Sequence, residues 1–89
     1  MPDTLRSERH KLLISLLVEA REKANLTQAE VAVRLGRHQS FIANIETHLR
    51  RVDVVELLDL ADAIGFDPDE MIAKLKKAKP GHRRRSRDR

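Results

Sequence analysis

Gln39 and Ser40 carry the side chains whose hydrogen-bonding chemistry is most specific in this 89-residue sequence. They open a short run in which Phe41, Ile42 and Ile45 are apolar, the spacing of an amphipathic helix. A glutamine amide holds a donor beside an acceptor, so it can bond N6 and N7 of adenine together, a pairing that discriminates between bases by about 1–3 kcal/mol. These residue types therefore predict hydrogen bonding to the edge of a base.

Two predicted helices and a tight turn must position these side chains. Thr27 and Glu30 have the spacing of a capping box, and Gly36 ends the helix because glycine enters the left-handed conformation at little cost. We predict one helix over about residues 28–35 and a second over about residues 39–47. This is a helix-turn-helix, which places its second helix in the major groove of DNA.

The stretch from about Arg21 to Met71 resembles the Cro/phage-repressor type of helix-turn-helix, often called the Xre family. The resemblance is carried by LTQAEVA, the pair Leu35-Gly36, QSFI, Glu46 and ADAIGFDPDEM. Gln28 and Gln39 each open a helix and stand eleven residues apart, as in that family. The resemblance implies an all-α fold, a compact five-helix phage-repressor-like DNA-binding domain.

Four residues are expected to read bases. Gln39 and Ser40 stand at the N-terminal end of the recognition helix, where side chains meet base edges. By the resemblance, Asn44 one turn later is the next base-reading position, and its amide offers the same donor and acceptor. Ala43 lies beside it and could touch a thymine methyl group. The alternative is that the polar residues only solvate an exposed helix face.

Six residues are expected to contact phosphates, which position a protein without reading sequence. In the family, the counterpart of Gln28 bonds a phosphate and braces the glutamine that opens the recognition helix. The other five flank that helix in the turns: Arg37, His38, Thr47, Arg50 and Arg51. The alternatives are a structural first-turn role for Gln28 and an idle surface position for any of the others.

Arg21 and Glu46 are expected to have an architectural role. The resemblance implies that they form a partly buried ion pair, which locks the first helix to the third. Removing one partner would leave the other charge buried and unpaired.

Three departures from the family pattern stand out. His48 replaces the usual glycine after Thr47, so we expect this loop to run differently. His38 replaces the usual serine or threonine cap of the recognition helix, which predicts a weaker cap and a frayed helix. Ala43 and Asn44 are short, which predicts few base contacts and a reliance on Gln39, Ser40 and DNA shape.

Three further helices are predicted around this pair. Their expected bounds are Thr4 or Ser7 to Ala24, Asp53 to Gly65, and Pro68 to about Lys79. Their expected core positions are Leu13, Leu16, Leu17, Ala20 and Ala24, then Leu57, Leu58, Leu60, Ala61 and Ile64, then Met71, Ile72 and Leu75. Capping boxes are expected at Asp53 with Glu56 and at Asp67 with Glu70.

The first helix has apolar residues on a second side, namely Leu12, Ile14 and Val18. Such a surplus face usually meets a second burial surface. It is covered either by the fourth or fifth helix, or by another copy of the chain in a dimer.

Most of the positive charge lies at the C-terminal end. Residues 1–79 hold 13 basic and 13 acidic groups, so the net charge of +4 belongs to residues 80–89, where five arginines oppose Asp88. We expect residues 1–79 to form one DNA-binding domain. Residues 80–89 should form a disordered arginine-rich tail that adds non-specific affinity.

Composition argues against several other classes of protein. The chain has no cysteine, no apolar run approaching the ~20 residues of a membrane span, and only two aromatic residues, Phe41 and Phe66. Disulfide scaffolds, membrane proteins and base-stacking binders of single strands are therefore not expected. We expect a cytoplasmic protein that is associated with the nucleoid when bound to DNA.

An enzyme is not expected either. The four histidines, His10, His38, His48 and His82, are scattered and lack the spacing of a metal site. Asp53, Glu56, Asp59 and Asp62 recur every three residues and predict a solvated or partner-facing acidic stripe. No cofactor and no metal are predicted.

The sequence thus predicts a regulator of transcription, acting as a repressor, that binds a palindromic operator in double-stranded DNA as a homodimer. One alternative is the antitoxin of a toxin–antitoxin pair or a restriction-modification controller, which have this fold and other partners. A second alternative is a protein-interaction adaptor that has lost operator binding.

Overall fold

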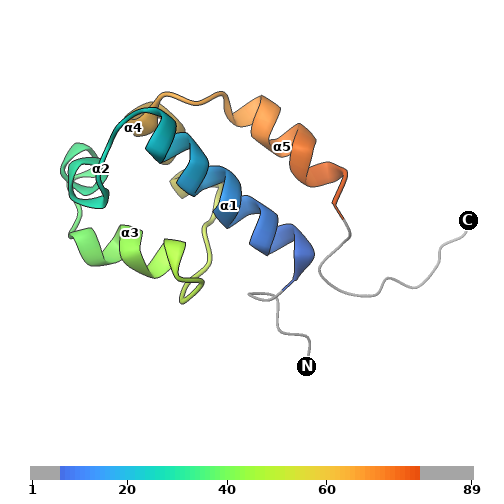
Figure 1. Cartoon of the computed structure of the whole chain (residues 1–89), viewed down its shortest axis with the longest axis horizontal. Coiled ribbons are helices and arrows are strands. Elements are labelled where there is room, and N and C mark those ends of the chain that lie inside the picture. Colours follow the sequence, from blue (N-terminus) through green and yellow to red (C-terminus); the bar gives the residue numbers. More distant parts are fainter. Residues whose placement is uncertain (1–6, 79–89) are drawn as a thin grey trace, which may run out of the picture.

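The computed structural model of the chain describes residues 7–78, and these form an all-α arrangement. The helices are α1 (Glu8–Lys23), α2 (Gln28–Leu35), α3 (Gln39–Glu46), α4 (Val54–Ile64) and α5 (Pro68–Lys76). α1 runs between α3 and α5, and α2 meets α3 at one end of the molecule (Figure 1). The expected all-α fold with five helices is confirmed. The predicted tail lies outside the described residues.

The helix-turn-helix is formed by α2 and α3, with the predicted local signals in place. Thr27 Oγ1 accepts from the Glu30 amide at 3.0 Å, and Glu30 Oε1 accepts from the Thr27 amide at 2.8 Å. Gly36 ends α2 with φ +69°. Its turn closes where the Arg37 amide donates to the Ala32 carbonyl at 2.9 Å. These contacts are local in sequence, so α2 has the predicted bounds, and α3 ends one residue earlier than predicted.

The capping contacts of α4 agree with the prediction, whereas those of α5 do not. Asp53 and Glu56 form the predicted capping box of α4, and Gly65 ends it with φ +100°. The box predicted with Glu70 is wrong, because the Asp67 carboxylate accepts from the Asp69 amide at 2.9 Å.

The C-terminal end of α5 also differs from the prediction. The helix ends at Lys76, three residues before the expected end. The Lys77 and Ala78 amides bond to carbonyls three residues back, which tightens the last turn. Arg9 of α1 donates to the carbonyls of Leu75 and Ala78 at 3.0 and 2.9 Å, which joins this end to α1.

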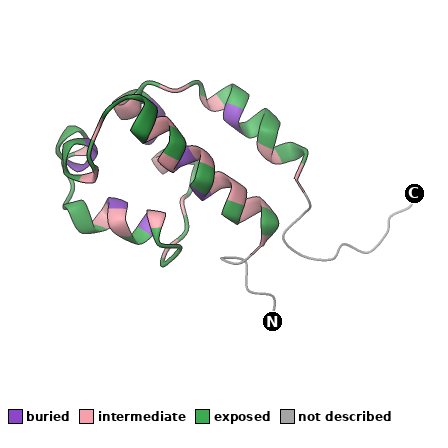
Figure 2. Ribbon diagram, viewed as in Figure 1, coloured by how far each residue is buried: buried purple, intermediate pink, exposed green. Residues whose placement is uncertain are grey.

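The core lies where the five helices converge (Figure 2). Its buried residues are Ile14, Leu17, Val31, Ala32, Ile42, Ile45, Leu57, Leu60, Ala61 and Met71. Ala32 is 2% exposed, and its small side chain lets α2 and α3 approach closely. Three core predictions are wrong, because Leu58 and Ile72 are 46% and 39% exposed and Ala24 is an exposed C-cap residue.

The surplus apolar face of α1 is largely covered within the chain. Ile14 is 2% exposed and belongs to the core, and Val18 packs against the core. Leu12, the third residue of this face, is half-buried. The structure therefore favours intramolecular cover over a dimer contact for this face. Among the described residues, no helix is long and apolar enough to cross a membrane.

Candidate nucleic-acid interface

The exposed side of α3 carries most of the predicted base-reading residues. Gln39, Ser40 and Asn44 are exposed, while Ala43 is half-buried. Ile42 and Ile45 of the same helix are buried in the core. Because the buried isoleucines fix the rotation of α3, its polar side chains are presented together to solvent.

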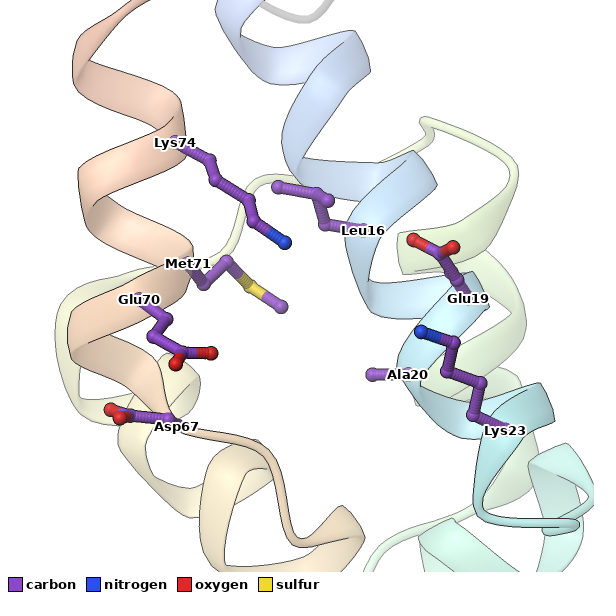
Figure 3. Close-up of a pocket in the computed structure, with 8 residues that line it drawn as sticks. All are labelled: Leu16, Glu19, Ala20, Lys23, Asp67, Glu70, Met71 and Lys74. Atoms are coloured by element: carbon purple, nitrogen blue, oxygen red, sulfur yellow. The ribbon is translucent and has the colours of Figure 1, made fainter.

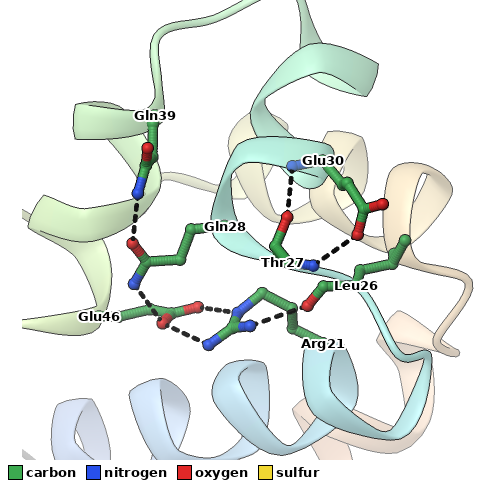
Figure 4. A network of polar contacts seen from close by, with 7 residues as sticks. All are labelled: Arg21, Leu26, Thr27, Gln28, Glu30, Gln39 and Glu46. Atoms are coloured by element: carbon green, nitrogen blue, oxygen red, sulfur yellow. Dashed lines mark hydrogen bonds and ion pairs between the residues drawn. The ribbon is translucent and has the colours of Figure 1, made fainter.

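A chain of polar contacts runs from α1 to the start of α3 (Figure 4). Arg21 Nε and Nη2 donate to the two carboxylate oxygens of Glu46 at 2.7 and 3.0 Å. Gln28 Nε2 donates to Glu46 Oε1 at 2.9 Å, and Gln39 Nε2 donates to Gln28 Oε1 at 3.2 Å. The amide at the tip of α3 is thus connected through two side chains to a guanidinium on α1.

The ion pair at the base of this chain is well enclosed. The side chains of Arg21 and Glu46 are 14% and 10% exposed. Arg21 Nη1 also donates to the Leu26 carbonyl at 2.8 Å, which ties the α1–α2 turn to the same pair. The hydrogen bonds to Glu46 raise the pKa of Arg21 above its usual value, against the opposing effect of burial. A bidentate pair of this kind fixes the relative placement of α1 and α3.

The turn before α3 has the weak cap predicted from His38. The His38 side chain makes no capping hydrogen bond, although its backbone is extended as an N-cap requires. α3 nevertheless begins at Gln39. The Phe41 amide of the first turn donates to the His38 carbonyl at 3.0 Å, while Gln39 and Ser40 at the start of the helix are exposed. Such a helix start favours an anion such as a phosphate.

Arg37, Phe41, Arg50 and Glu56 form a cluster that sequence reasoning missed. The Cζ atoms of Arg37 and Arg50 lie 4.0 and 4.7 Å from the centroid of the Phe41 ring, distances typical of cation–π contact. Arg50 makes two hydrogen bonds to Glu56, of 3.2 and 3.0 Å, and Arg37 lies 3.8 Å from the same carboxylate. Two of the three arginines predicted to meet phosphates, Arg37 and Arg50, therefore contact one carboxylate of α4.

The loop after α3 keeps the left-handed turn despite its histidine. His48 has φ +65°, so the expectation of a different loop path is wrong. Its ring lies edge-on to that of His10, with 5.7 Å between centroids. Two of the histidines taken as scattered are thus neighbours, because α1 packs against α3. Asn25 adopts the same conformation, φ +59°, after α1.

His10 is a partly buried titratable group next to the turn that follows α3. Its Nε2 atom is buried and has no hydrogen-bond partner among residues 7–78. Burial, together with the nearby His48 and Arg51, lowers the pKa of His10 below its usual 6.5. A neutral imidazole is therefore favoured under the turn that follows α3.

Thr47 and the acidic residues of α4 have specific roles in the structure. Thr47 Oγ1 donates to the Ala43 carbonyl at 2.8 Å, which closes the last turn of α3. The predicted acidic stripe is divided, since Glu56 faces Arg50 whereas Asp59 and Asp62 lie on another surface beside Arg34.

A separate cleft of about 110 Å³ lies between α1 and α5 (Figure 3). Leu16, Ala20 and Met71 supply its apolar lining, and Lys23 and Lys74 are among the charged residues around it. It lies away from α3 and is small for an organic ligand. Within residues 7–78, no three histidine or carboxylate side chains are grouped so that they could hold a metal ion.

Comparisons with known proteins agree with this architecture. A protein-family model described as a helix-turn-helix domain matches residues 15–73. A curated but uncharacterized HTH-type transcriptional regulator, y4dJ of Sinorhizobium fredii, is 34% identical over 62 residues, which are 70% of this chain and 80% of that protein.

Solved structures of other proteins are also similar to this chain. An XRE-family like protein from Pseudomonas syringae pv. tomato str. DC3000 is 47% identical with a TM-score of 0.74, over 76% of this chain and 83% of that chain. The restriction-modification controller protein C.AhdI from Aeromonas hydrophila is 30% identical with a TM-score of 0.62, over 67% of this chain and 91% of that chain.

Proposed function

The chain belongs to the Xre-type helix-turn-helix family of DNA-binding transcriptional regulators, and from this premise we propose that it is a repressor that binds a palindromic operator as a homodimer. It acts on nucleoid DNA in the cytoplasm and catalyses no reaction. The two half-sites lie about one helical turn apart, because each recognition helix enters the major groove on the same side of the duplex.

The connection from Arg21 through Glu46 and Gln28 to Gln39 is the observation that carries this proposal. It holds an exposed amide at the start of α3 without using the donor and acceptor completely. A preorganised amide loses less conformational entropy when it bonds a base. If the polar side of α3 only faced solvent, holding the Gln39 amide in one position would have no role in recognition.

We assign the contacts to DNA by position and chemistry. The residues assigned to base edges are Gln39, Ser40, Ala43 and Asn44. The residues assigned to phosphates are Gln28, Arg37, His38, Thr47, Arg50 and Arg51. Ala43 is half-buried, so its contribution is limited to a methyl contact.

Exposed apolar side chains beside α3 support the proposed homodimer. Leu49, Val54 and Val55 are 70%, 70% and 67% exposed, and Leu58 follows one turn later on α4. A second copy would cover this surface and would place two recognition helices about one two-fold axis. Sedimentation that gives a monomer at high micromolar concentration would rule out the dimer.

A restriction-modification controller is the second candidate function. It is favoured by the similarity to C.AhdI, 91% of whose chain is covered. Both candidates bind DNA, and they differ in the genes that are controlled. An antitoxin or a protein-interaction adaptor on the same fold would differ in its protein partner.

Selection of bound sequences from a random duplex pool at physiological salt tests the proposal. A palindromic motif supports both operator binding and the dimer. An adaptor enriches no sequence. In that case a Gln39→Ala variant would also leave every cellular readout unchanged, whereas the repressor predicts a loss of regulation.

A further inference from the structure

Glu56 occupies an unusual place beside the proposed interface. Its side chain is only 12% exposed, and its carboxylate contacts the N-cap residue of α4 as well as arginines before and after α3. Oε1 accepts from the Asp53 amide at 3.1 Å, which completes the cap of α4. The same carboxylate accepts both hydrogen bonds from Arg50 and lies 3.8 Å from Arg37. A cap alone does not need these two cations.

The two arginines stand on either side of the recognition helix in the sequence. Arg37 lies in the turn before α3, and Arg50 lies in the loop after it. Both guanidinium groups approach the ring of Phe41, which projects from α3 itself. Glu56 therefore holds two cations against one side chain of the helix that is proposed to enter the major groove.

The charges of this cluster decide how strongly it attracts phosphates. Two guanidinium groups and one carboxylate leave a net charge of +1, and a neutral residue at position 56 would leave +2. A carboxylate and a phosphate oxygen bind a guanidinium in the same bidentate way, so they compete for it. Each additional phosphate that a protein neutralises steepens the dependence of log Kobs on log salt by about 0.9.

We propose that Glu56 is a positioning residue that holds Arg37 and Arg50 on Phe41 and limits their attraction to DNA phosphates. It thereby lowers the salt dependence and the sequence-independent part of the affinity. This inference rests on the proposed function, since it concerns the phosphate contacts of the same interface.

A Glu56→Gln variant of the full chain tests the proposal, because glutamine can still complete the capping box while the charge is lost. Asp59→Asn is the matched control. It removes the same charge from α4, one turn further on, on the surface shared with Arg34. Fluorescence anisotropy is measured from 50 to 300 mM salt, with a duplex that carries the selected site and a scrambled duplex of equal length.

Glu56→Gln is expected to steepen the salt slope by about one unit and to tighten binding to both duplexes roughly five- to tenfold at 0.1 M salt. Asp59→Asn should leave the slope as in the wild type. In an Arg37→Gln, Arg50→Gln background the effect of Glu56→Gln should vanish, since the cations through which it acts are gone.

Two results would overturn the inference alone. One is a Glu56→Gln slope equal to that of Asp59→Asn, and the other is weaker binding with an unchanged slope, which is the signature of a lost cap. Thermal unfolding followed by circular dichroism separates that case from a binding effect. Wild-type protein that binds neither duplex at any salt would instead overturn the proposed function, and this inference with it.

Discussion

Gln39 donates a hydrogen bond from Nε2 to Oε1 of Gln28 at 3.2 Å, so the two glutamines that open α2 and α3 are joined side chain to side chain. Gln28 in turn donates to Glu46. The carboxamide of Gln28 thus links an exposed group to a well-enclosed ion pair. Its replacement should affect recognition and stability together, whereas replacement of Gln39 should affect recognition alone.

Gln39→Ala should lower the discrimination between the selected site and a single-base variant by about 1–3 kcal/mol, because a bidentate amide contact is lost. Its melting temperature should change little, since the side chain is exposed. Gln28→Ala should show a similar loss of discrimination and, in addition, lose about 1 kcal/mol of stability through the bond to Glu46. Competition binding measures the discrimination, and thermal melts measure the stability. Unaltered discrimination in both variants would show that the amides do not read bases.

Arg21→Met should destabilise the fold by about 3 kcal/mol, because the Glu46 carboxylate, 10% exposed, loses its charge partner. Urea unfolding monitored by circular dichroism gives the value. Arg21→Met combined with Glu46→Leu should recover much of the loss, since no charge is then left unpaired. If the single variant is as stable as the wild type, the pair is not architectural.

Gly36→Ala should cost about 1–2 kcal/mol of stability, because a side chain is disfavoured at φ +69°. In the described part of the chain, no atom beyond the adjacent residues lies within 4 Å of a Cβ at this position, so crowding adds nothing. Gly36→Asn is the control and should cost less, since asparagine tolerates the left-handed conformation. Equal losses from alanine and asparagine would mean that the conformation of the turn is not the cause.

His10 should make the stability dependent on pH. Its pKa is lower in the folded chain than its usual 6.5, so the unfolded state binds the proton first as the pH falls. The free energy of unfolding should therefore be level above about pH 7.5 and decrease as the pH falls through 6.5.

The comparison is a series of urea unfolding curves between pH 5.5 and 8 for the wild type, His10→Gln and His38→Asn. His10→Gln should flatten the profile, and His38→Asn should not. A profile that is the same with and without His10 would assign the pH dependence to other groups.

Deletion of residues 81–89 should flatten the salt dependence of binding and leave the preferred sequence unchanged, because five arginines there supply sequence-independent attraction. The slope should fall by at most about 4.5 units, the value for five phosphate contacts at about 0.9 each. Titrations from 50 to 300 mM salt check it, with the five arginines changed to serine as the control. A collapse of sequence preference would instead make the tail a reader.

Features that depend on neighbours in the sequence could be predicted from it. Thr27 with Glu30 and Asp53 with Glu56 cap their own helices, so the starts of α2 and α4 needed no knowledge of the fold. Ile14 was expected on the surplus face of α1 and instead belongs to the core, because the buried sides of a long helix depend on how α3 and α5 pack against it.

Contacts between distant segments could not be predicted by the same means. Glu56 appeared in the sequence as one of four regularly spaced carboxylates, and its distinct role depends on Arg37, nineteen positions earlier. His10 and His48 become neighbours only through the packing of α1 against α3. The residues of each pair are far apart in the sequence, so no local pattern predicts the contact. The tertiary structure is needed to find it.

The polar chain that begins at Arg21 also has a consequence for redesign. The exposed face of α3 looks like an independent module whose side chains could be exchanged for those of another regulator. Yet Glu46, at the end of α3, is bonded to both Arg21 and Gln28. A graft that changes the specificity must therefore keep Glu46 and must match residue 28 to whatever opens the new helix. If only the base-reading residues were transferred, the side chains that hold them in position would be missing.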